Sequence, residues 1–468
     1  MTTIIDRPAR TPAAVANRGL RILCPNGHLG FAPTRIGSFE RGLAAEPDMI
    51  ACDSGSSDCG PVPLGSDGSA SPLAWQTHDI EAMLLGARRL DVPMIIGSAG
   101  DTGTNSRVDR YVGIVRDLAK KHGLAPFRLG YFYSEISPQA VRERMLAGAV
   151  VSGLDGRPDL SLDELAATDR IVAVAGVHPY IKLLDMGAEV IIGGRSSDCA
   201  IFAAPAIRRG YPEALAYYYG KILECASFCA EPYAGKESVM GEITHGDVKV
   251  TAMLPEQRCT VASVAAHAMY ERSNPFYEYF LGGHIDMRDC VYEQFDERTT
   301  RVTGPVYAPA VELRVKLEGA GKVGERSVGM VGIRDPYTIA HVDEVIAWAK
   351  AAVRERFGED GYELTYTVYG RDGVMGELEP TRRPAHELCI VVQGVAPTRE
   401  MAEELCMIGT RQMFYARLPD VKGTAGGVAF LLDEVLPASP AYRWTLNHTM
   451  PVTDPLELFP VHITEIGA

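Results

Sequence analysis

The first two hundred residues alternate short apolar runs with longer stretches in which apolar positions recur at helical spacing. The runs predict strands at 21–24, 49–52, 94–96, 127–133 and 189–192, and the periodic stretches predict helices at 75–90 and 169–186. A further helix is predicted after residue 104, with Ser106 and Asp109 as its capping box and Val108 and Tyr111 on its apolar face. Strands that alternate with helices in this way predict βα units on a mainly parallel sheet.

The pattern changes beyond about residue 245. Strand-like runs at 248–254, 311–317 and 329–333 predict an α+β subregion, and strand, helix and strand patterns at 387–392, 398–415 and 427–432 are typical of a ferredoxin-like module. We therefore predict an α/β fold with a mainly parallel sheet flanked by helices, an α+β subregion and a C-terminal ferredoxin-like α+β domain. The expected division is a flexible tail at 1–19, an α/β domain at 20–360 and the ferredoxin-like domain at 361–468.

Composition narrows the classes of partner. The chain has 46 basic and 60 acidic residues, a formal charge of −14, which argues against a nucleic-acid or anionic-membrane surface. No apolar run approaches the length of a membrane span, and the N-terminus lacks the apolar core of a signal peptide. The ten cysteines occur as singles, several within apolar runs, as in reduced proteins. We expect a cytoplasmic protein with a small-molecule partner, and base rates favour a homo-oligomer.

Two strand-to-helix turns are rich in glycine, serine and aspartate. One follows residue 96 and the other follows residue 192, and neither is a dinucleotide fingerprint or a P-loop. Turns of this kind at the carboxyl ends of parallel strands admit ligands to the backbone, so we expect a binding site there. The candidate substrate-binding residues in these turns are Ser98, Gly100, Asp101, Arg195 and Ser196.

A third turn, after residue 52, contains Asp53 and Asp58. Paired carboxylates at a strand end can serve as acid and base or hold a divalent cation, the one cofactor that this pattern suggests. The alternative is that these residues only build hydrogen-bonded turns. The convergence of three such turns on one sheet favours the functional interpretation.

Arg195 follows two glycines, where a guanidinium can bind a carboxylate or phosphate through two hydrogen bonds; its alternative is an ion pair with Asp198. Helical spacing places Lys221, Glu224 and Cys225 on one side of a helix, either as a thiol activated by a lysine or as a salt bridge beside a buried cysteine. Asp53, Asp58, Asp198 and these three residues are the catalytic candidates.

Arg258 precedes a predicted helix and His267 lies two turns into it, which suggests an anion contact and an acid or base. A single histidine on a helix is more often an ordinary hydrogen-bonded residue. The chain has no HExxH, GxSxG or Walker sequence, which disfavours metalloproteases, α/β-hydrolases and P-loop enzymes.

Taken together, several phrases resemble the acyclic terpene utilisation AtuA family over nearly the whole chain from about residue 20. They are ACDSGSSDCGP at 51–61, IIGSAG at 95–100, Gly194-Arg195 with Asp198, GKILEC at 220–225, Arg258-Cys-Thr260 with Ser273-Asn-Pro275, KLEGA at 316–320 and Arg334-Asp-Pro336. The tail phrases Tyr369-Gly370, GVMGE at 373–377 and Val395-Ala-Pro397 are similar to the ferredoxin-like region of that family.

The resemblance implies a role in the breakdown of acyclic terpenes, in which the intermediates are branched acyl-CoA thioesters. We expect an enzyme that binds a small carboxylate or acyl-CoA and performs acid–base chemistry as a lyase, such as a hydratase or dehydratase, or as an isomerase. Two alternatives remain. One is a non-catalytic binding or accessory subunit, whose ferredoxin-like tail joins it to a small accessory protein or partner enzyme. The other is a hydrolase that depends on Cys225.

Overall fold

The computed structural model describes residues 18–381, 383–421 and 427–467. They form two compact units, one comprising the chain up to Ala320 together with Trp444–Ala468, and the other comprising Gly321–Arg443. The predicted boundary between residues 360 and 361 falls inside the second unit, and the predicted tail at 1–19 lies almost entirely outside the described residues. No helix in the described part of the chain is long and apolar enough to cross a membrane.

The first half of unit 1 alternates strands and helices, as the apolar pattern predicts. The elements are β1 (Leu20–Cys24), α2 (Ile36–Ala44), β2 (Met49–Gly55), α3 (Val62–Ser66), α4 (Leu73–Leu90), β3 (Met94–Asp101), α5 (Asn105–His122), β4 (Phe127–Phe132), β5 (Glu135–Ile136), α6 (Pro138–Leu146), β6 (Ser152–Gly153), α7 (Leu162–Ala166), β7 (Arg170–Val174), α8 (His178–Asp185), β8 (Val190–Ile192), α9 (Ala200–Arg208), α10 (Glu213–Leu223) and η1 (Ala226–Cys229).

The second half of unit 1 is richer in strands. Its elements are β9 (Val239–Ile243), β10 (Val248–Ala252), α11 (Val261–Ala268), β11 (Tyr277–Phe280), β12 (Gly283–Asp286), β13 (Val291–Gln294), β14 (Thr299–Thr303), β15 (Val306–Pro309), the first part of β16 (Arg314–Ile333), most of β21 (Ala441–Pro451) and β22 (Val461–Ile466).

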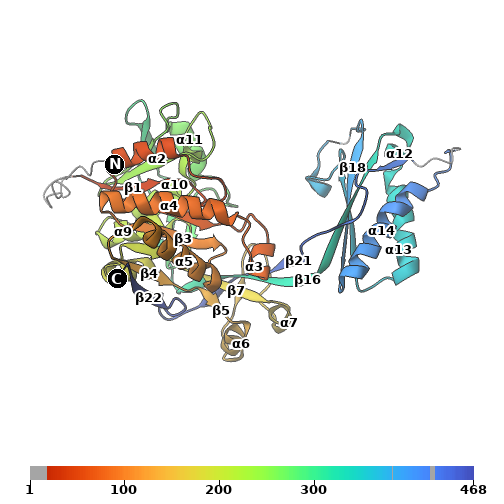
Figure 1. Ribbon diagram of the computed structural model, residues 1–468, viewed down its shortest axis with the longest axis horizontal. Coiled ribbons are helices and arrows are strands. Elements are labelled where there is room, and N and C mark those ends of the chain that lie inside the picture. Colours follow the sequence, from red (N-terminus) through yellow and green to blue (C-terminus); the bar gives the residue numbers. More distant parts are fainter. Residues whose placement is uncertain (1–17, 382, 422–426, 468) are drawn as a thin grey trace. The chain divides into compact units, whose positions relative to one another are not determined.

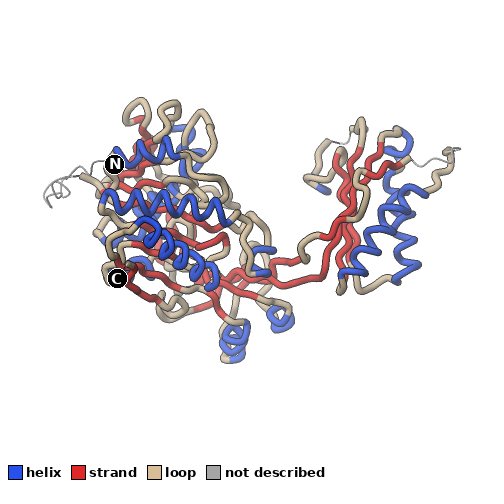
Figure 2. The backbone as a smooth tube through the Cα atoms, in the orientation of Figure 1, coloured by secondary structure: helices blue, strands red, loops and turns tan. Residues whose placement is uncertain are grey.

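The main sheet has the strand order β13-β14-β10-β9-β1-β2-β3-β8-β4-β22. The five central strands from β1 to β4 pair in parallel, and the pairings outside them are antiparallel. This confirms the predicted parallel strands flanked by helices; the antiparallel strands on both sides make the whole sheet mixed. Figure 1 shows α4 and α5 on one face of the strands, and Figure 2 shows the same layering by secondary structure.

Alternate residues of the central strands supply two hydrophobic cores, one on each face. Ile50 and Ile96 pack towards α4 and α5, whereas Ala51 and Ile95 pack towards the helices on the opposite face, which include α8, α9 and α10. Because both faces of the parallel strands are covered by helices, the carboxyl ends of the strands are the open edge of this sheet.

Unit 2 has the β-α-β-β-α-β order of a ferredoxin-like module. Its elements are the remainder of β16, α12 (Pro336–Ala340), α13 (Val342–Phe357), β17 (Glu363–Tyr369), η2 (Gly376–Leu378), β18 (Leu388–Ala396), α14 (Arg399–Tyr415), β19 (Val428–Phe430) and β20 (Leu436–Pro437). Strand β16 pairs with β18 on one side and with β19 and β20 on the other, and β18 pairs with β17, all antiparallel. Helices α13 and α14 pack together beside these strands (Figure 1).

Three predicted elements differ from the structure. The segment 170–174 is not the start of a helix but strand β7, which pairs with residues 316–320 of β16 and places the β-branched Val172 in contact with that strand. The predicted strands 311–317 and 329–333 are parts of the single strand β16. Ser106 lies inside α5 instead of capping it, because Thr104 is the N-cap residue and the Ser106 hydroxyl donates to Asp67.

Candidate functional site

The loops that follow β2, β3 and β8 meet at the carboxyl edge of the parallel sheet, since these three strands are neighbours. Ser98 links two of them: its hydroxyl accepts a hydrogen bond from the Ser196 amide at 3.2 Å and donates to the Ser196 carbonyl at 3.3 Å. Ser98 and Asp101 have positive φ angles of 46° and 70°, which the turn requires and which serine and aspartate adopt less readily than glycine. The predicted convergence of these turns is therefore a property of the fold.

Arg195 is buried at this junction and its guanidinium is held mainly by Glu318 of β16. Its Nε donates to Glu318 Oε2 at 2.8 Å and its Nη2 donates to Oε1 at 3.3 Å. Lys316 adds a second cation, with Nζ 2.9 Å from Glu318 Oε1. Burial opposes ionisation of Glu318, but the charges and hydrogen bonds of Arg195 and Lys316 together outweigh it and lower the pKa of this carboxyl. The predicted partner Asp198 is a weaker one, 3.5 Å from Arg195 Nη1.

Two glycines make room for this guanidinium. A Cβ at Gly55 would lie 2.3 Å from the Ser98 Cβ and 2.7 Å from Arg195 Nη1. A Cβ at Gly103, where φ is +64°, would lie 2.1 Å from the Arg195 backbone nitrogen. Both spacings are far shorter than a van der Waals contact, so these positions admit only glycine.

Asp53 lies at the end of β2, buried beside this pair. Its Oδ2 accepts a hydrogen bond from the Gly55 amide at 2.8 Å, whereas its Oδ1 is buried without a hydrogen-bond partner among the described residues. Burial and the nearby charge of Asp198 raise the pKa of Asp53 to about 8, against the opposing effect of Arg195. The surroundings of Asp53 therefore favour its protonated form.

A second ionic cluster begins at the end of α10. Lys221 and Glu224 form a buried ion pair, and Lys221 Nζ lies 3.9 Å from Glu278, which also pairs with Arg272 at 2.7 Å. Burial raises the pKa of Glu224 to about 8, although Lys221 opposes this effect. Only Lys221 belongs to the helix, since α10 ends at Leu223; the predicted helical face of three residues is thus incomplete.

Asp198 lies between the two clusters. Its negative charge acts on Asp53 and Arg195 on one side and on Glu224 and Glu278 on the other. Its side chain is 46% exposed, whereas those of Arg195, Glu318, Lys221 and Glu224 are each less than a tenth exposed. Asp198 is therefore the carboxylate of this junction that a ligand can reach.

Cys225 is half-buried, and its sulfur lies 2.8 Å from the Tyr270 hydroxyl. Burial, followed by the charge of Glu224, raises the pKa of the Cys225 thiol. A raised pKa keeps this sulfur protonated, which is the opposite of what a cysteine nucleophile requires.

Three aromatic side chains and a lysine form a cluster that reaches Cys225 through Phe228, whose amide donates to the Cys225 carbonyl at 3.3 Å. Lys236 Nζ lies 5.6 Å from the Phe31 ring centroid and 5.2 Å from that of Phe228, and the Phe228 and Tyr233 rings are 5.4 Å apart. Phe31, Phe228 and Tyr233 are all exposed. We call these four residues the aromatic rim. A cation among apolar rings suits an anion that carries an apolar chain.

Other predicted residues do not join the junction. Asp58 is exposed, and Arg258 is 62% exposed with a loose ion pair to Glu231 at 3.9 Å. His267 is buried against the Tyr270 ring, and burial, with a smaller effect of Lys221, lowers its pKa to about 3. Gly100 has a φ of +63° and packs against the Arg107 side chain, a structural role.

Asp101 belongs to a different network from the one predicted. Its carboxylate accepts hydrogen bonds from His28 Nε2 at 3.0 Å, from the Ser71 amide at 3.0 Å, from the Ser71 hydroxyl at 2.7 Å and from the Ser69 hydroxyl. Burial opposes ionisation, but these donors lower the pKa of Asp101 to about 2. A narrow cavity with room for about one water molecule joins Asp101 to Arg195 and Glu318.

Sequence reasoning missed several residues of the site. Glu318 occupies a strand whose partner β7 lies far earlier in the chain, Glu278 lies in the short hairpin of β11 and β12, and His28 stands alone in its loop. The one available signal was that Glu318 follows directly after the predicted strand 311–317. Among the described residues, no group of three or more histidine, cysteine, aspartate or glutamate side chains is arranged to hold a metal ion.

Comparison with protein families places the chain. Residues 20–442 match the family described as acyclic terpene utilisation family protein AtuA. The chain belongs to the AtuA family. Comparisons with curated proteins and with solved structures found no match.

Proposed function

We propose that this AtuA family member is an enzyme that binds a small carboxylic acid, free or as its CoA thioester, at the carboxyl edge of the parallel sheet. There it moves protons at the carbons next to the carbonyl group, as a lyase of the hydratase or dehydratase type or as an isomerase. The observation that carries this proposal is the accessible Asp198 between two buried carboxyl groups, Asp53 and Glu224, whose pKa values are both raised to about 8. Burial and repulsion between like charges keep protons on acids at neutral pH, which acid–base catalysis requires.

Ligand recognition in this proposal is the task of the aromatic rim and of Arg195. Lys236 of the aromatic rim is the cation for a carboxylate or phosphate, and the exposed rings of Phe31, Phe228 and Tyr233 are the contact surface for a branched apolar chain. Arg195 Nη1 contributes a hydrogen bond on the inner side, where its contacts with Ser98 and Asp198 are long, at 3.4 and 3.5 Å. The family description, which names acyclic terpenes, agrees with an apolar acid as substrate.

A hydratase or dehydratase needs two groups, one to take a proton from carbon and one to exchange a proton with the departing or entering oxygen. Asp198 is suited to the second task because it is exposed to ligand and its charge acts on the buried Asp53, whose pKa is raised. The alternative of a cysteine-dependent hydrolase is disfavoured by the raised pKa of Cys225. A binding subunit without catalysis is the alternative that the experiment must separate.

The test uses short branched 3-hydroxy acids, the matching unsaturated acids and their CoA thioesters. Each is incubated with the full chain in D2O, and mass spectrometry follows the loss or gain of water and the entry of deuterium next to the carbonyl. We expect turnover with at least one pair and a loss of about 10²-fold or more in Asp198→Asn, with binding retained in a thermal-shift assay. Asp185→Asn is the matched control, since Asp185 is an exposed aspartate paired with Arg208 at the end of α8.

Two results would contradict the proposal. Binding of these ligands to the wild type without any change in mass would identify a binding subunit. Equal turnover by Asp198→Asn and Asp185→Asn would remove Asp198 from the reaction.

A further inference from the structure

We propose that His28, held by Asp101, is the base that takes the proton from the carbon next to the carbonyl group of the substrate. This assignment rests on the proposed function and names the base for the carbon-bound proton, to which the proposed function assigns no residue. His28 lies in the loop after β1, and Asp101 is the last residue of β3. The two meet through a hydrogen bond of 3.0 Å between His28 Nε2 and Asp101 Oδ1.

The Asp101 carboxylate fixes the proton arrangement on the imidazole ring. It already accepts from the Ser71 amide and from the hydroxyls of Ser69 and Ser71, so it is ionised and can only accept. His28 Nε2 must therefore donate, which leaves Nδ1 with a free lone pair in the neutral ring. A carboxylate behind a histidine also stabilises the imidazolium that forms when the ring takes a proton.

Nδ1 is the nitrogen available to a ligand. It has no hydrogen-bond partner within residues 18–381, 383–421 and 427–467, and it does not belong to the polar atoms that are buried without a partner. The His28 side chain is 7% exposed, so the ring is nearly enclosed while this atom reaches the surface. Enclosure limits competing contacts with water and fixes the direction of the lone pair.

The loop that carries His28 is rigidly anchored. The carboxylate of the buried Asp79 accepts hydrogen bonds from the Gly30 amide at 3.0 Å and the Thr34 amide at 2.7 Å. The His28 amide donates to the Asn26 side chain at 3.2 Å, and the ring stacks on Phe31 with centroids 5.2 Å apart. A base that must meet one carbon–hydrogen bond needs such fixed geometry.

The same contacts place His28 beside the site. The Leu29 amide donates to the Asp53 carbonyl at 2.9 Å, and a Cβ at Gly27 would lie 2.4 Å from the Cys225 backbone. Phe31, on which the ring stacks, belongs to the aromatic rim. His28 thus stands between the apolar contact surface and the carboxyl junction.

The step is balanced without a further reactant. The carbon–hydrogen bond of the substrate breaks, its electron pair stays on the substrate as an enolate, and the proton moves to His28 Nδ1. The imidazolium keeps its Nε2–H bond to Asp101. In a dehydration the electron pair then expels the hydroxyl group, which leaves as water after receiving a proton from the carboxyl side of the site.

The experiment compares His28→Gln with His122→Gln in the deuterium-exchange assay. His122 is a matched control because its Nε2 lies 2.5 Å from Glu81 Oε1, a second histidine–carboxylate pair, at the end of α5 and away from the His28 loop. We expect His28→Gln to bind the substrate but to exchange deuterium about 10²-fold more slowly or worse, and His122→Gln to match the wild type. Exchange by His28→Gln at the wild-type rate, with substrate turned over, would overturn the role of His28 while leaving the proposed function intact.

Two further measurements cover a variant that fails to fold and a wild type that shows no turnover. Carbethoxylation of the wild type should block exchange, bound substrate should protect His28, and hydroxylamine should restore activity; blocked exchange with His28 unmodified would overturn the assignment. Nitrogen NMR should show a proton on Nε2 and a free Nδ1 in the wild type, and an altered ratio of the two forms in Asp101→Asn. A proton resident on Nδ1 would overturn the assignment on its own, and a wild type that exchanges no deuterium would overturn it together with the proposed function.

Discussion

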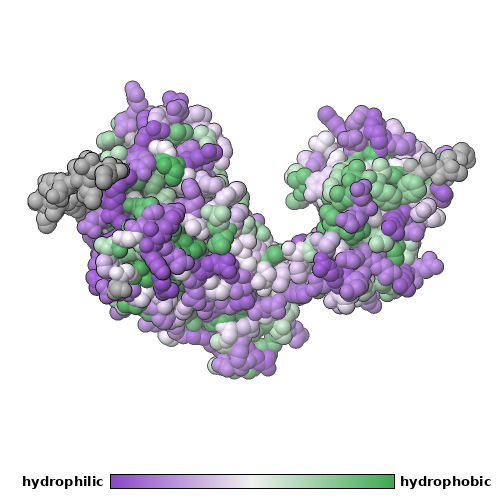
Figure 3. Space-filling model, viewed as in Figure 1, coloured by the Kyte–Doolittle hydropathy of each residue, from purple (hydrophilic) through white to green (hydrophobic). Residues whose placement is uncertain are grey.

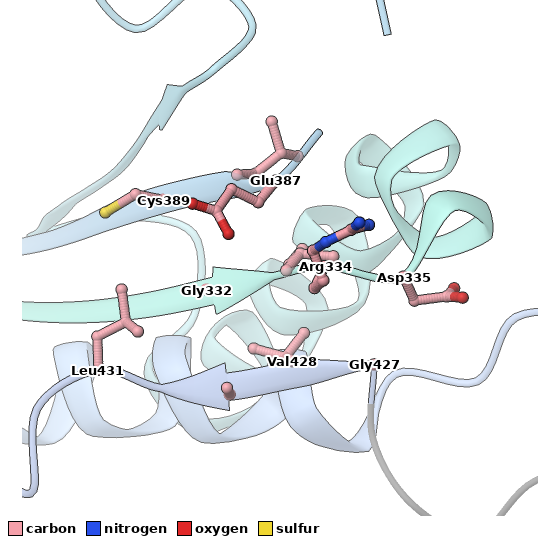
Figure 4. A pocket seen from close by; sticks show the side chains of 11 residues that line it. Gly332, Arg334, Asp335, Glu387, Cys389, Gly427, Val428 and Leu431 are labelled. Atoms are coloured by element: carbon pink, nitrogen blue, oxygen red, sulfur yellow. The ribbon is translucent and has the colours of Figure 1, made fainter. Parts of the chain in front are cut away.

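The carboxyl edge in unit 1 and a pocket at the ends of the unit 2 strands are both concave and carry charged residues, but they differ in what surrounds the charges. The unit 2 pocket is the roomier, at about 490 Å³, and it is lined by the ends of β16, β18 and β19. Figure 4 shows Arg334 just beyond the end of β16 and Glu387 at the start of β18. Both are exposed, and neither forms an ion pair with another described residue.

The charges at the carboxyl edge of unit 1 are mostly buried and act on one another, and within the described residues the carboxyl groups whose pKa values are raised lie at this edge. Figure 3 shows apolar residues gathered on the visible face of unit 2. Unit 2 also has exposed apolar side chains, Val374 and Leu378 among them, which contribute apolar surface without proton chemistry. The comparison teaches that burial of charge, and not the size of a hollow, marks the place where the fold can do acid–base work.

Breaking the ion pair between Arg195 and Glu318 should give the largest effect on stability. Arg195→Ala leaves Glu318 buried with only Lys316 as its partner, and loss of one member of a buried pair costs about 3–5 kcal/mol. Chemical denaturation measures this change. Arg208→Ala removes an exposed pair with Asp185 and should change the free energy of unfolding by less than about 1 kcal/mol. Equal effects of the two variants would show that burial does not distinguish them.

The raised pKa of Asp53 predicts how stability depends on pH. Because its pKa is about 8 in the folded chain and near 4 in the unfolded chain, the stabilising contribution of the protonated form is complete below about pH 4 and is lost as the pH rises to about 8. The Asp53→Asn side chain cannot ionise, so the variant does not lose this contribution. Its free energy of unfolding minus that of the wild type should therefore increase between pH 5 and pH 8, by on the order of a few kcal/mol, and then level off.

Thermal unfolding of both proteins across this range is the measurement. Asp185→Asn controls for the loss of one negative charge, because its side chain is exposed. A constant difference between Asp53→Asn and the wild type at all pH values would show that the carboxyl is ionised in the folded protein.

The smallest effect is expected in unit 2. Arg334 is exposed and unpaired among the described residues, so Arg334→Ala should change the free energy of unfolding by no more than about 0.5 kcal/mol and leave substrate turnover at the wild-type rate. Loss of turnover in this variant would place the site in unit 2 and would contradict the conclusion that buried charge marks the site.

Much of the local structure was predictable from the chain alone. Apolar runs identified the central strands, and the helices at 73–90 and 399–415 lie within two residues of their predicted limits, since their periodic apolar faces pack on the sheets beside them. The prediction failed at 170–174, where pairing with β16 outweighs the local pattern. It failed again at 311–333, where two apolar runs belong to one strand.

The candidate site shows the same division. The amino-acid pattern shows which turns carry glycines and polar side chains, and it therefore indicated Asp53, Ser98, Arg195 and Asp198 as candidates, because turn chemistry at strand ends is local. Their chemical states depend on contacts that form on folding. Glu318, more than a hundred residues from Arg195 along the chain, accepts hydrogen bonds from the Arg195 guanidinium, and His28 forms a hydrogen bond with Asp101, the last residue of β3. Ionisation depends on burial and on the charges that folding brings together, and neither quantity exists in the chain before it folds.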